Sequence, residues 1–135
     1  MEKTKTIRQK ELIPGVTPGE VYEALTNASR HSAFTGSRAT GAARAGSKFT
    51  AWDGYITGKH LELEKGKRIV QEWTTSEWPE GQEPSRIEWT FNAKKGGTEV
   101  TMVHSKVPAS QVESYRQGWI DYYWEPLKQH FAARS

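Results

Sequence analysis

The chain has 135 residues, of which 26% are charged and 35% hydrophobic, and its formal net charge is +3. These values predict a single globular domain over residues 1–135 and exclude a disordered chain, and the small, scattered charge gives no reason to expect a nucleic-acid partner. Because cysteine is absent, disulfides, thiolate nucleophiles and sulfur-ligated zinc are excluded as well. The N-terminal stretch lacks the apolar segment of a signal peptide and no apolar run reaches membrane-spanning length, so we expect a cytoplasmic protein without a membrane partner.

Three elements are expected in the first part of the chain. Residues 4–13 mix apolar and charged side chains, which is typical of an edge strand. Thr17 can cap a helix, and Glu20 follows three residues later, so the two predict a capping box at a helix start. A second short helix is expected over residues 27–34, and Gly36 marks its end.

From residue 36 to residue 107 the pattern changes to strands. Glycines recur between short runs in which apolar and polar residues alternate. The string KKGG at 94–97 lies between two such runs and is a hairpin signal. We predict six or seven antiparallel strands, and in three of them alternation places a triplet on one face: Ile69, Gln71 and Trp73; Ile87, Trp89 and Phe91; Val100, Met102 and His104.

The last segment predicts one long helix. Ser110 is followed three residues later by Glu113, which is a second capping box. The helix is too apolar for a surface position, so we expect a curved sheet to wrap it. Pro126 removes the backbone hydrogen bond to the carbonyl of Tyr122 and favours a kink there. The apolar stripe recurs at helical spacing at Val112, Trp119, Tyr123, Leu127 and Phe131.

The aromatic side chains between helix and sheet allow two interpretations. They can fill the core completely, which is the more common arrangement. Alternatively, large rings can frame an incompletely filled cavity between the helix and the sheet. The sequence leaves both open.

Familiar catalytic and cofactor motifs are missing from the chain. GAARAGSK at 41–48 has the wrong residue order for a phosphate-binding loop and precedes a strand instead of a helix. The four histidines show no metal-ligand spacing. Neither a nucleophile elbow nor an acid and base in opposed environments can be identified. We therefore expect no cofactor, no metal site and no catalytic residue.

Two residues have several open interpretations. His104 shares a face with Met102, either as a core histidine hydrogen-bonded within the protein or as a cavity group that contacts a ligand or acts as acid–base. Trp78 lies in the polar loop SEWPEGQEP at 76–84. There it can fold back as a lid, anchor a protein partner, or plug local packing.

Eight strings carry a family resemblance: VYEALT at 21–26, FTG at 34–36, DGYITG at 53–58, LELEKGKRIVQEW at 61–73, WPEG at 78–81, GTEVTMVH at 97–104, VP at 107–108 and GWIDYYWEPLKQHF at 118–131. In this order, over almost the whole chain, they resemble the C-terminal domain of the activator of heat-shock protein 90 ATPase and its stand-alone microbial relatives. The resemblance implies an α+β helix-grip, or START-like (SRPBCC), fold: a curved antiparallel sheet of six or seven strands round a long C-terminal helix, with two short helices after the first strand. The chain departs from the family pattern at Ser47–Lys48, His60 and Thr74.

Three functions remain as expectations. The first, which the START-like superfamily implies, is non-catalytic binding of a hydrophobic or aromatic small molecule between the sheet and the last helix. The second is a chaperone-regulating interaction module with Trp78 as the contact. The third is an enzyme of the cyclase or hydrolase type. The expected cavity residues are Phe34, Phe49, Trp52, Gln71, Trp73, Trp89, Phe91, Met102, His104, Trp119, Tyr123 and Leu127.

Overall fold

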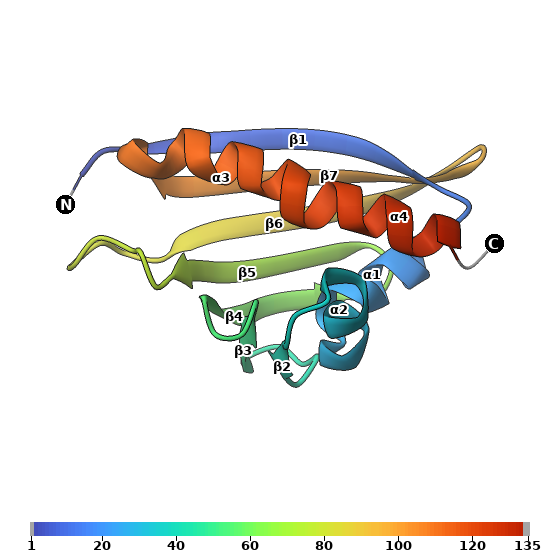
Figure 1. The fold of residues 1–135 in the computed structure, drawn as a ribbon, viewed down its shortest axis with the longest axis horizontal. Helices are drawn as coiled ribbons and strands as arrows, with labels where there is room; N and C mark the ends of the chain where they lie inside the picture. The colour runs from blue at the N-terminus through green and yellow to red at the C-terminus, as the bar shows by residue number, and fades with distance from the viewer. Residues whose placement is uncertain (1, 134–135) are drawn as a thin grey trace.

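The strands form one antiparallel sheet, and the C-terminal helix lies across one of its faces (Figure 1). The computed structural model describes residues 2–133. Over these residues the sheet has seven strands in the order β1-β7-β6-β5-β4-β3-β2. Their bounds are β1 Thr4–Pro14, β2 Thr40–Gly41, β3 Lys48–Ala51, β4 Ile56–Glu64, β5 Arg68–Thr75, β6 Ser85–Lys94 and β7 Gly97–Pro108. The expected α+β helix-grip architecture is confirmed, and β1 is an edge strand, as its mixed composition predicts.

The helices follow the first and the last strand of the chain. Two short ones, α1 (Pro18–Thr26) and α2 (Ala28–Thr35), follow β1, and a 3₁₀ turn, η1 (Ala109–Gln111), follows β7. The final helix runs from Val112 to Ala133 in three parts: α3 (Val112–Trp119), a π-helical segment η2 (Ile120–Trp124) and α4 (Glu125–Ala133). Among residues 2–133, no helix combines the length and the apolar character needed to cross a membrane.

The start of α1 confirms the first capping box. The hydroxyl oxygen of Thr17 accepts a hydrogen bond from the backbone N–H of Glu20 at 3.2 Å, and the Glu20 carboxylate accepts one from the backbone N–H of Thr17 at 3.0 Å. Both pairings satisfy donors that a helix start leaves free. The end of α2 also agrees with expectation, since Gly36 adopts a left-handed φ of 78° there.

The second predicted capping box is wrong. The 3₁₀ turn shifts the helix start past Ser110, and the cap position falls on Gln111, whose side chain makes no capping bond. The backbone N–H of Ser110 donates instead to a carboxylate oxygen of Glu2 at 2.9 Å. A partner from the opposite end of the chain therefore replaces the local cap.

The last helix accommodates Pro126 with a π-helical turn, which is wider than an α-helical one. Proline has no N–H to donate, and the segment just before it is π-helical, with the N–H of Glu125 bonded to the carbonyl of Ile120 five residues back. Such π segments are single-turn insertions in longer helices. Where the sequence predicts a kink at Tyr122, the structure has this π-helical segment.

The inner face of the sheet carries the predicted triplets. All nine of their side chains are buried, and those of Ile69, Ile87, Val100, Met102 and His104 are fully so. Rings from the last helix pack against this face, with Trp119 and Trp124 at 5.5 and 5.8 Å from Trp89, centroid to centroid. Aromatic burial thus holds the helix to the sheet.

Candidate functional site

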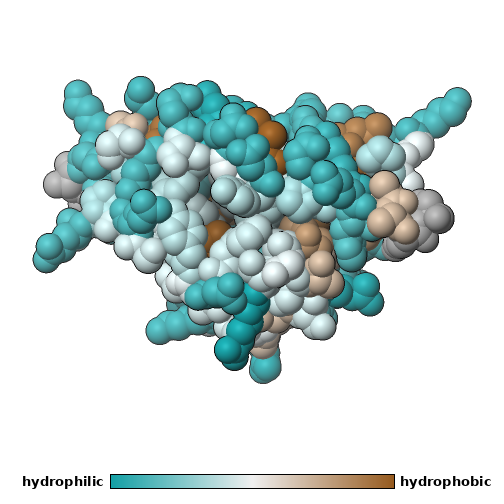
Figure 2. Space-filling model, viewed as in Figure 1, coloured by the Kyte–Doolittle hydropathy of each residue, from teal (hydrophilic) through white to brown (hydrophobic). Residues whose placement is uncertain are grey.

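A cavity of about 450 Å³ opens between the last helix and the β3–β5 side of the sheet. We call it the aromatic cavity, because seven of the ten residues that line it carry aromatic rings. In the space-filling view, a hydrophobic area is visible in a recess between the last helix and the strands beside it (Figure 2). The lining residues are Trp52, Tyr55, Ile56, Trp73, Ser114, Tyr115, Gly118, Trp119, Tyr122 and Tyr123.

The tight turn between β3 and β4 places Trp52 at this cavity. Trp52 and Asp53 both have positive φ, 52° and 56°, and the N–H of Gly54 donates to the carbonyl of Ala51 at 3.2 Å. A left-handed φ at successive turn residues normally selects glycine or asparagine. A tryptophan in this conformation is strained, and such strain is found preferentially at functional sites.

Gly118 leaves room on the helix side of the cavity. It lies inside α3, where glycine is the least favourable residue after proline. A Cβ atom added at this position would meet only Cδ2 of Tyr122, at 3.9 Å, an ordinary van der Waals distance. No steric contact therefore requires a glycine here.

The wall rings fix one another. Trp119 packs against Tyr123 at 4.8 Å and against Trp73 at 5.5 Å, and Trp73 meets Tyr115 edge to face at 5.1 Å. At the outer side, Trp52 meets Tyr122 at 5.2 Å, and the Tyr122 side chain is 55% exposed. The inner rings of the wall are therefore held by their contacts with one another, and the cavity is accessible to solvent beside Tyr122.

Three wall tyrosines direct their hydroxyl groups to protein partners. The Tyr55 hydroxyl donates to the carboxylate of Glu77 at 2.5 Å, and the Tyr115 hydroxyl is 2.7 Å from that of Thr75. The Tyr123 hydroxyl lies 3.0 Å from Nε2 of His31. Burial raises the pKa of Tyr55, Tyr115 and Tyr123, in the case of Tyr55 together with the Glu77 contact.

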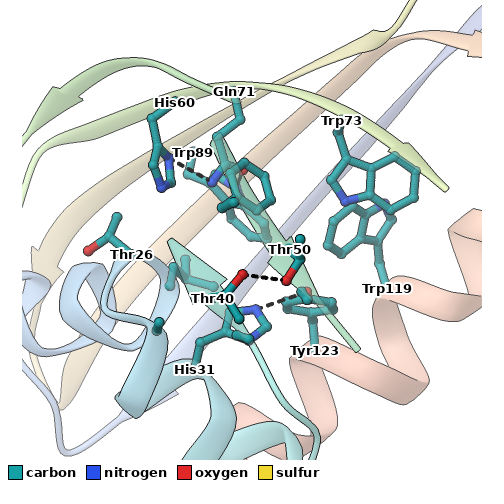
Figure 3. Close-up of a pocket in the computed structure, with 15 residues that line it drawn as sticks. Thr26, His31, Thr40, Thr50, His60, Gln71, Trp73, Trp89, Trp119 and Tyr123 are labelled. Atoms are coloured by element: carbon teal, nitrogen blue, oxygen red, sulfur yellow. Dashed lines mark hydrogen bonds between the residues drawn. The ribbon is translucent and has the colours of Figure 1, made fainter. Parts of the chain in front are cut away.

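A second, much smaller cavity of about 30 Å³ shares Trp73, Trp119 and Tyr123 with the first. We call it the polar cavity. It has room for about two water molecules. Figure 3 shows its polar side chains, which converge from the sheet and from α1 and α2: Thr26, His31, Thr40, Thr50, His60 and Gln71.

The histidines of the polar cavity are neutral. Burial lowers the pKa of His31 to about 4, and it also lowers the pKa of His60. Nδ1 of His31 is buried and has no hydrogen-bond partner among residues 2–133. Gln71 links the sheet side, with its amide nitrogen 3.4 Å from Nδ1 of His60 and its oxygen accepting from Nε1 of Trp89 at 3.3 Å.

His104 belongs to the core and lines neither cavity. Nε1–H of Trp119 donates to its Nδ1 at 3.1 Å, so the ring proton sits on Nε2, which donates to Ser85 Oγ at 2.8 Å. The Ser85 hydroxyl in turn donates to the carbonyl of Trp73 at 2.6 Å. Burial lowers the pKa of His104 to about 3. Of the two interpretations of this residue, the structure supports the hydrogen-bonded core histidine.

The other predicted cavity residues divide between the cavities and the core. Trp52 lines the aromatic cavity, and Trp73, Trp119 and Tyr123 line both cavities. Phe49, Gln71 and Trp89 line only the polar cavity. Four further residues line neither of them and are buried in the core, because the helix and sheet pack closely there: Phe34, Phe91, Met102 and Leu127.

Several lining residues are not among the sequence predictions. Tyr55 lies in the turn between two strands, and Tyr122 lies on the flank of the apolar stripe of the last helix, so neither position by itself indicated a cavity. His31 lies in a short helix with weak periodicity. Gly118 does carry a signal, because an isolated glycine within a helical pattern calls for a local reason.

Trp78 is half-buried and packs back on the protein. Its ring is 6.1 Å from that of Trp73 and 6.2 Å from that of Tyr115, and its Nε1–H donates to the carbonyl of Glu83 at 2.9 Å. Among its predicted roles, these contacts are those of a packing plug. A lid or partner-contact role remains a prediction.

Three comparisons relate the chain to known proteins. The sequence model of the family described as Activator of Hsp90 ATPase homolog 1-like protein matches residues 15–132. The human Activator of 90 kDa heat shock protein ATPase homolog 1 is 40% identical over 115 residues, which cover 85% of this chain and 34% of that protein. The corresponding homolog from Dictyostelium discoideum is 32% identical over 133 residues, covering 98% of this chain and 34% of its own length. The chain thus spans about a third of the length of these relatives.

A solved structure shares the fold. The crystal structure of an HSP90 activator from Plasmodium falciparum matches with a TM-score of 0.80 at 24% identity, and the match covers 93% of each chain. At this identity the likeness concerns the arrangement of the sheet and helices, since function lies in sites and not in folds.

Proposed function

This chain belongs to the family of Activator of Hsp90 ATPase homolog 1-like proteins, and within that family we propose that it binds a hydrophobic small molecule in the aromatic cavity, without chemically changing it. The observation that carries the proposal is the cavity itself. Its volume of about 450 Å³ lies within the range of small-molecule sites, and an apolar wall with few polar groups is typical of them.

Two features of the wall support this proposal. Trp52 is held in a strained turn, and Gly118 weakens the helix without any steric need. Each costs folding free energy of about 1 kcal/mol. Both costs fall on the residues that line one cavity, which is the pattern expected when a site is kept open for a ligand.

We make no proposal of catalysis. The residues that line the aromatic cavity include no carboxylate, histidine, lysine or arginine, so no wall residue offers the acid–base pair that a cyclase or hydrolase would need.

The indole N–H signals of the six tryptophans test the proposal. Three of them, Trp52, Trp73 and Trp119, line the aromatic cavity. Trp124 is buried elsewhere with its N–H bonded to Gln9, and serves as the internal control. In nitrogen–proton correlation spectra, titration with 2-naphthol, 1-decanol and decanoate should shift the three cavity signals and leave that of Trp124 in place. If none of these molecules moves them at millimolar concentration, the cavity is not a ligand site.

A second candidate function rests on sequence identity. The 40% identity to the human Activator of 90 kDa heat shock protein ATPase homolog 1 leads us to propose that this chain also contacts a 90 kDa heat-shock chaperone in the cytoplasm. Trp78 stays the candidate contact. Adding the purified chain to such a chaperone should change its ATPase rate, and Trp78→Ala should reduce the change while the circular dichroism spectrum is retained. If the ATPase rate of the chaperone is the same with and without the chain, the result would argue against this contact.

A further inference from the structure

The aromatic cavity has walls that discriminate between ligand classes. We propose that its ligand is a flat, uncharged aromatic molecule, and that carboxylates, ammonium ions and flexible alkyl chains bind more weakly. This inference rests on the proposed function, because it concerns the ligand of the same site.

The first ground is the absence of charge. Neither cavity has a Lys, Arg, Asp or Glu side chain among its lining residues. The histidines beside them are neutral near pH 7, because burial lowers their pKa. Burying a charged group without a partner is strongly unfavourable. A carboxylate or ammonium group inside the cavity would have no opposite charge to pair with.

The second ground is that three of the five hydroxyl groups in the wall are already engaged. Tyr55 is bonded to Glu77, Tyr115 to Thr75 and Tyr123 to His31. A carboxylate needs several hydrogen-bond donors to replace its water. Nε1–H of Trp52 is a single buried donor in the wall without a partner among the described residues, and these three tyrosines would have to break existing bonds to add to it. Near Tyr55, the carboxylate of Glu77 would also repel an anion.

The third ground is the shape of the wall. Seven of its ten residues are aromatic, and ring-to-ring contacts hold Trp73, Trp119 and Tyr123 in fixed orientations. When the ligand is also a flat ring, each ring pair with the wall adds about twofold to tenfold in affinity beyond area burial. An alkyl chain makes no such pairs and loses rotational freedom on binding.

The experiment compares matched ligands by calorimetry at pH 7: 2-naphthol, 2-naphthoate, 2-naphthylmethylammonium and 1-decanol. We expect 2-naphthol to bind about tenfold or more tightly than either charged naphthyl compound, and about threefold or more tightly than 1-decanol. A charged compound that equals or exceeds 2-naphthol would overturn the uncharged class. A 1-decanol affinity equal to that of 2-naphthol would overturn the flat class.

Variants on the exposed part of the wall separate ring recognition from general apolar burial. Tyr122 is 55% exposed, so Tyr122→Leu should fold while it removes one ring. It should weaken 2-naphthol about threefold to tenfold and leave 1-decanol within about twofold. Ile120→Leu is the matched control: Ile120 is 37% exposed on the same π-helical segment but does not line the cavity, so both affinities should stay unchanged. Equal losses for both ligands in Tyr122→Leu would refute ring recognition.

The outcomes also distinguish this inference from the proposed function. If at least one of the four molecules binds and shifts the cavity tryptophans, the site exists, and the order of affinities decides the ligand class. If none binds, the proposed function fails and the ligand class fails with it.

Discussion

Substitutions at Gly118 test both the stability of the last helix and ligand binding in the aromatic cavity. Replacing it by alanine should raise the free energy of unfolding by about 0.5–1 kcal/mol, because glycine is a poor helix residue. The added Cβ atom would meet only Cδ2 of Tyr122 at 3.9 Å, so no clash offsets the gain. For a domain of this size, the gain corresponds to about 2–5 °C in melting temperature.

A larger side chain at the same position should block the cavity. Gly118 lines the aromatic cavity, and apart from Tyr122 nothing lies within 4 Å of the added Cβ. Gly118→Leu should therefore fold at least as stably as the parent chain while its side chain occupies the mouth of the cavity. The dissociation constant of 2-naphthol should rise about tenfold or more, since lost contacts worth about 1.4 kcal/mol have this effect.

Urea unfolding followed by circular dichroism measures the stability, and calorimetry measures the binding. Gly36→Ala is the control of opposite sign. Gly36 also has nothing within 4 Å of an added Cβ, but its φ is 78°, so alanine there should cost about 1–2 kcal/mol through the left-handed backbone alone. If Gly118→Ala lowers the free energy of unfolding, or if Gly118→Leu binds 2-naphthol as tightly as the parent chain does, the inference that position 118 has space for a side chain is wrong.

Three further predictions concern the core and the caps. Burial lowers the pKa of His104 from 6.5 to about 3, so the unfolded chain takes up the proton first and stability should fall from pH 6.5 toward pH 3, with a contribution from His104 of at most about 1.4 kcal/mol per pH unit. His31 and His60, whose pKa burial also lowers, add to this fall, so in urea unfolding at pH 7 to 4 His104→Gln should make the slope smaller by the His104 part. Ser85→Ala leaves Nε2–H of His104 without its acceptor and should cost about 1–3 kcal/mol, whereas Ser105→Ala, at a half-buried hydroxyl with one long bond of 3.4 Å, should change stability by less than about 0.5 kcal/mol. Thr17→Ala should cost about 1 kcal/mol by removing a cap, while an equal loss in thermal unfolding of Ser110→Ala would contradict the absence of a cap there.

The sequence alone was sufficient for the order of the main strands and helices and for the inner faces of three strands. The strand triplets at 69–73, 87–91 and 100–104 point inward because alternation is a local property of an extended chain. The capping box at Thr17 forms because its two partners are three residues apart. The family strings, spread over most of the chain, were enough to predict the helix-grip fold.

The tertiary structure decided which polar and aromatic groups meet. Ser110 does not cap the last helix, because a 3₁₀ turn moves the helix start to Val112, and the N–H of Ser110 donates instead to Glu2 from the far end of the chain. Both ring nitrogens of His104 are hydrogen-bonded within the core, to Ser85 and Trp119 from two other elements. Nothing in local periodicity states such pairings, since they depend on how strands and helix come together.

The cavity is likewise a property of the assembled fold. The sequence offered a filled core or an open cavity, because both need the same inward-facing rings. The volume of these rings relative to the space between helix and sheet decides between the two. The space that stays open is lined by Tyr122 and Tyr123 of the π-helical segment, by Trp52 of the strained turn and by Gly118. Residue types fix how much apolar surface must be buried, whereas only the packed arrangement fixes where the packing stops short.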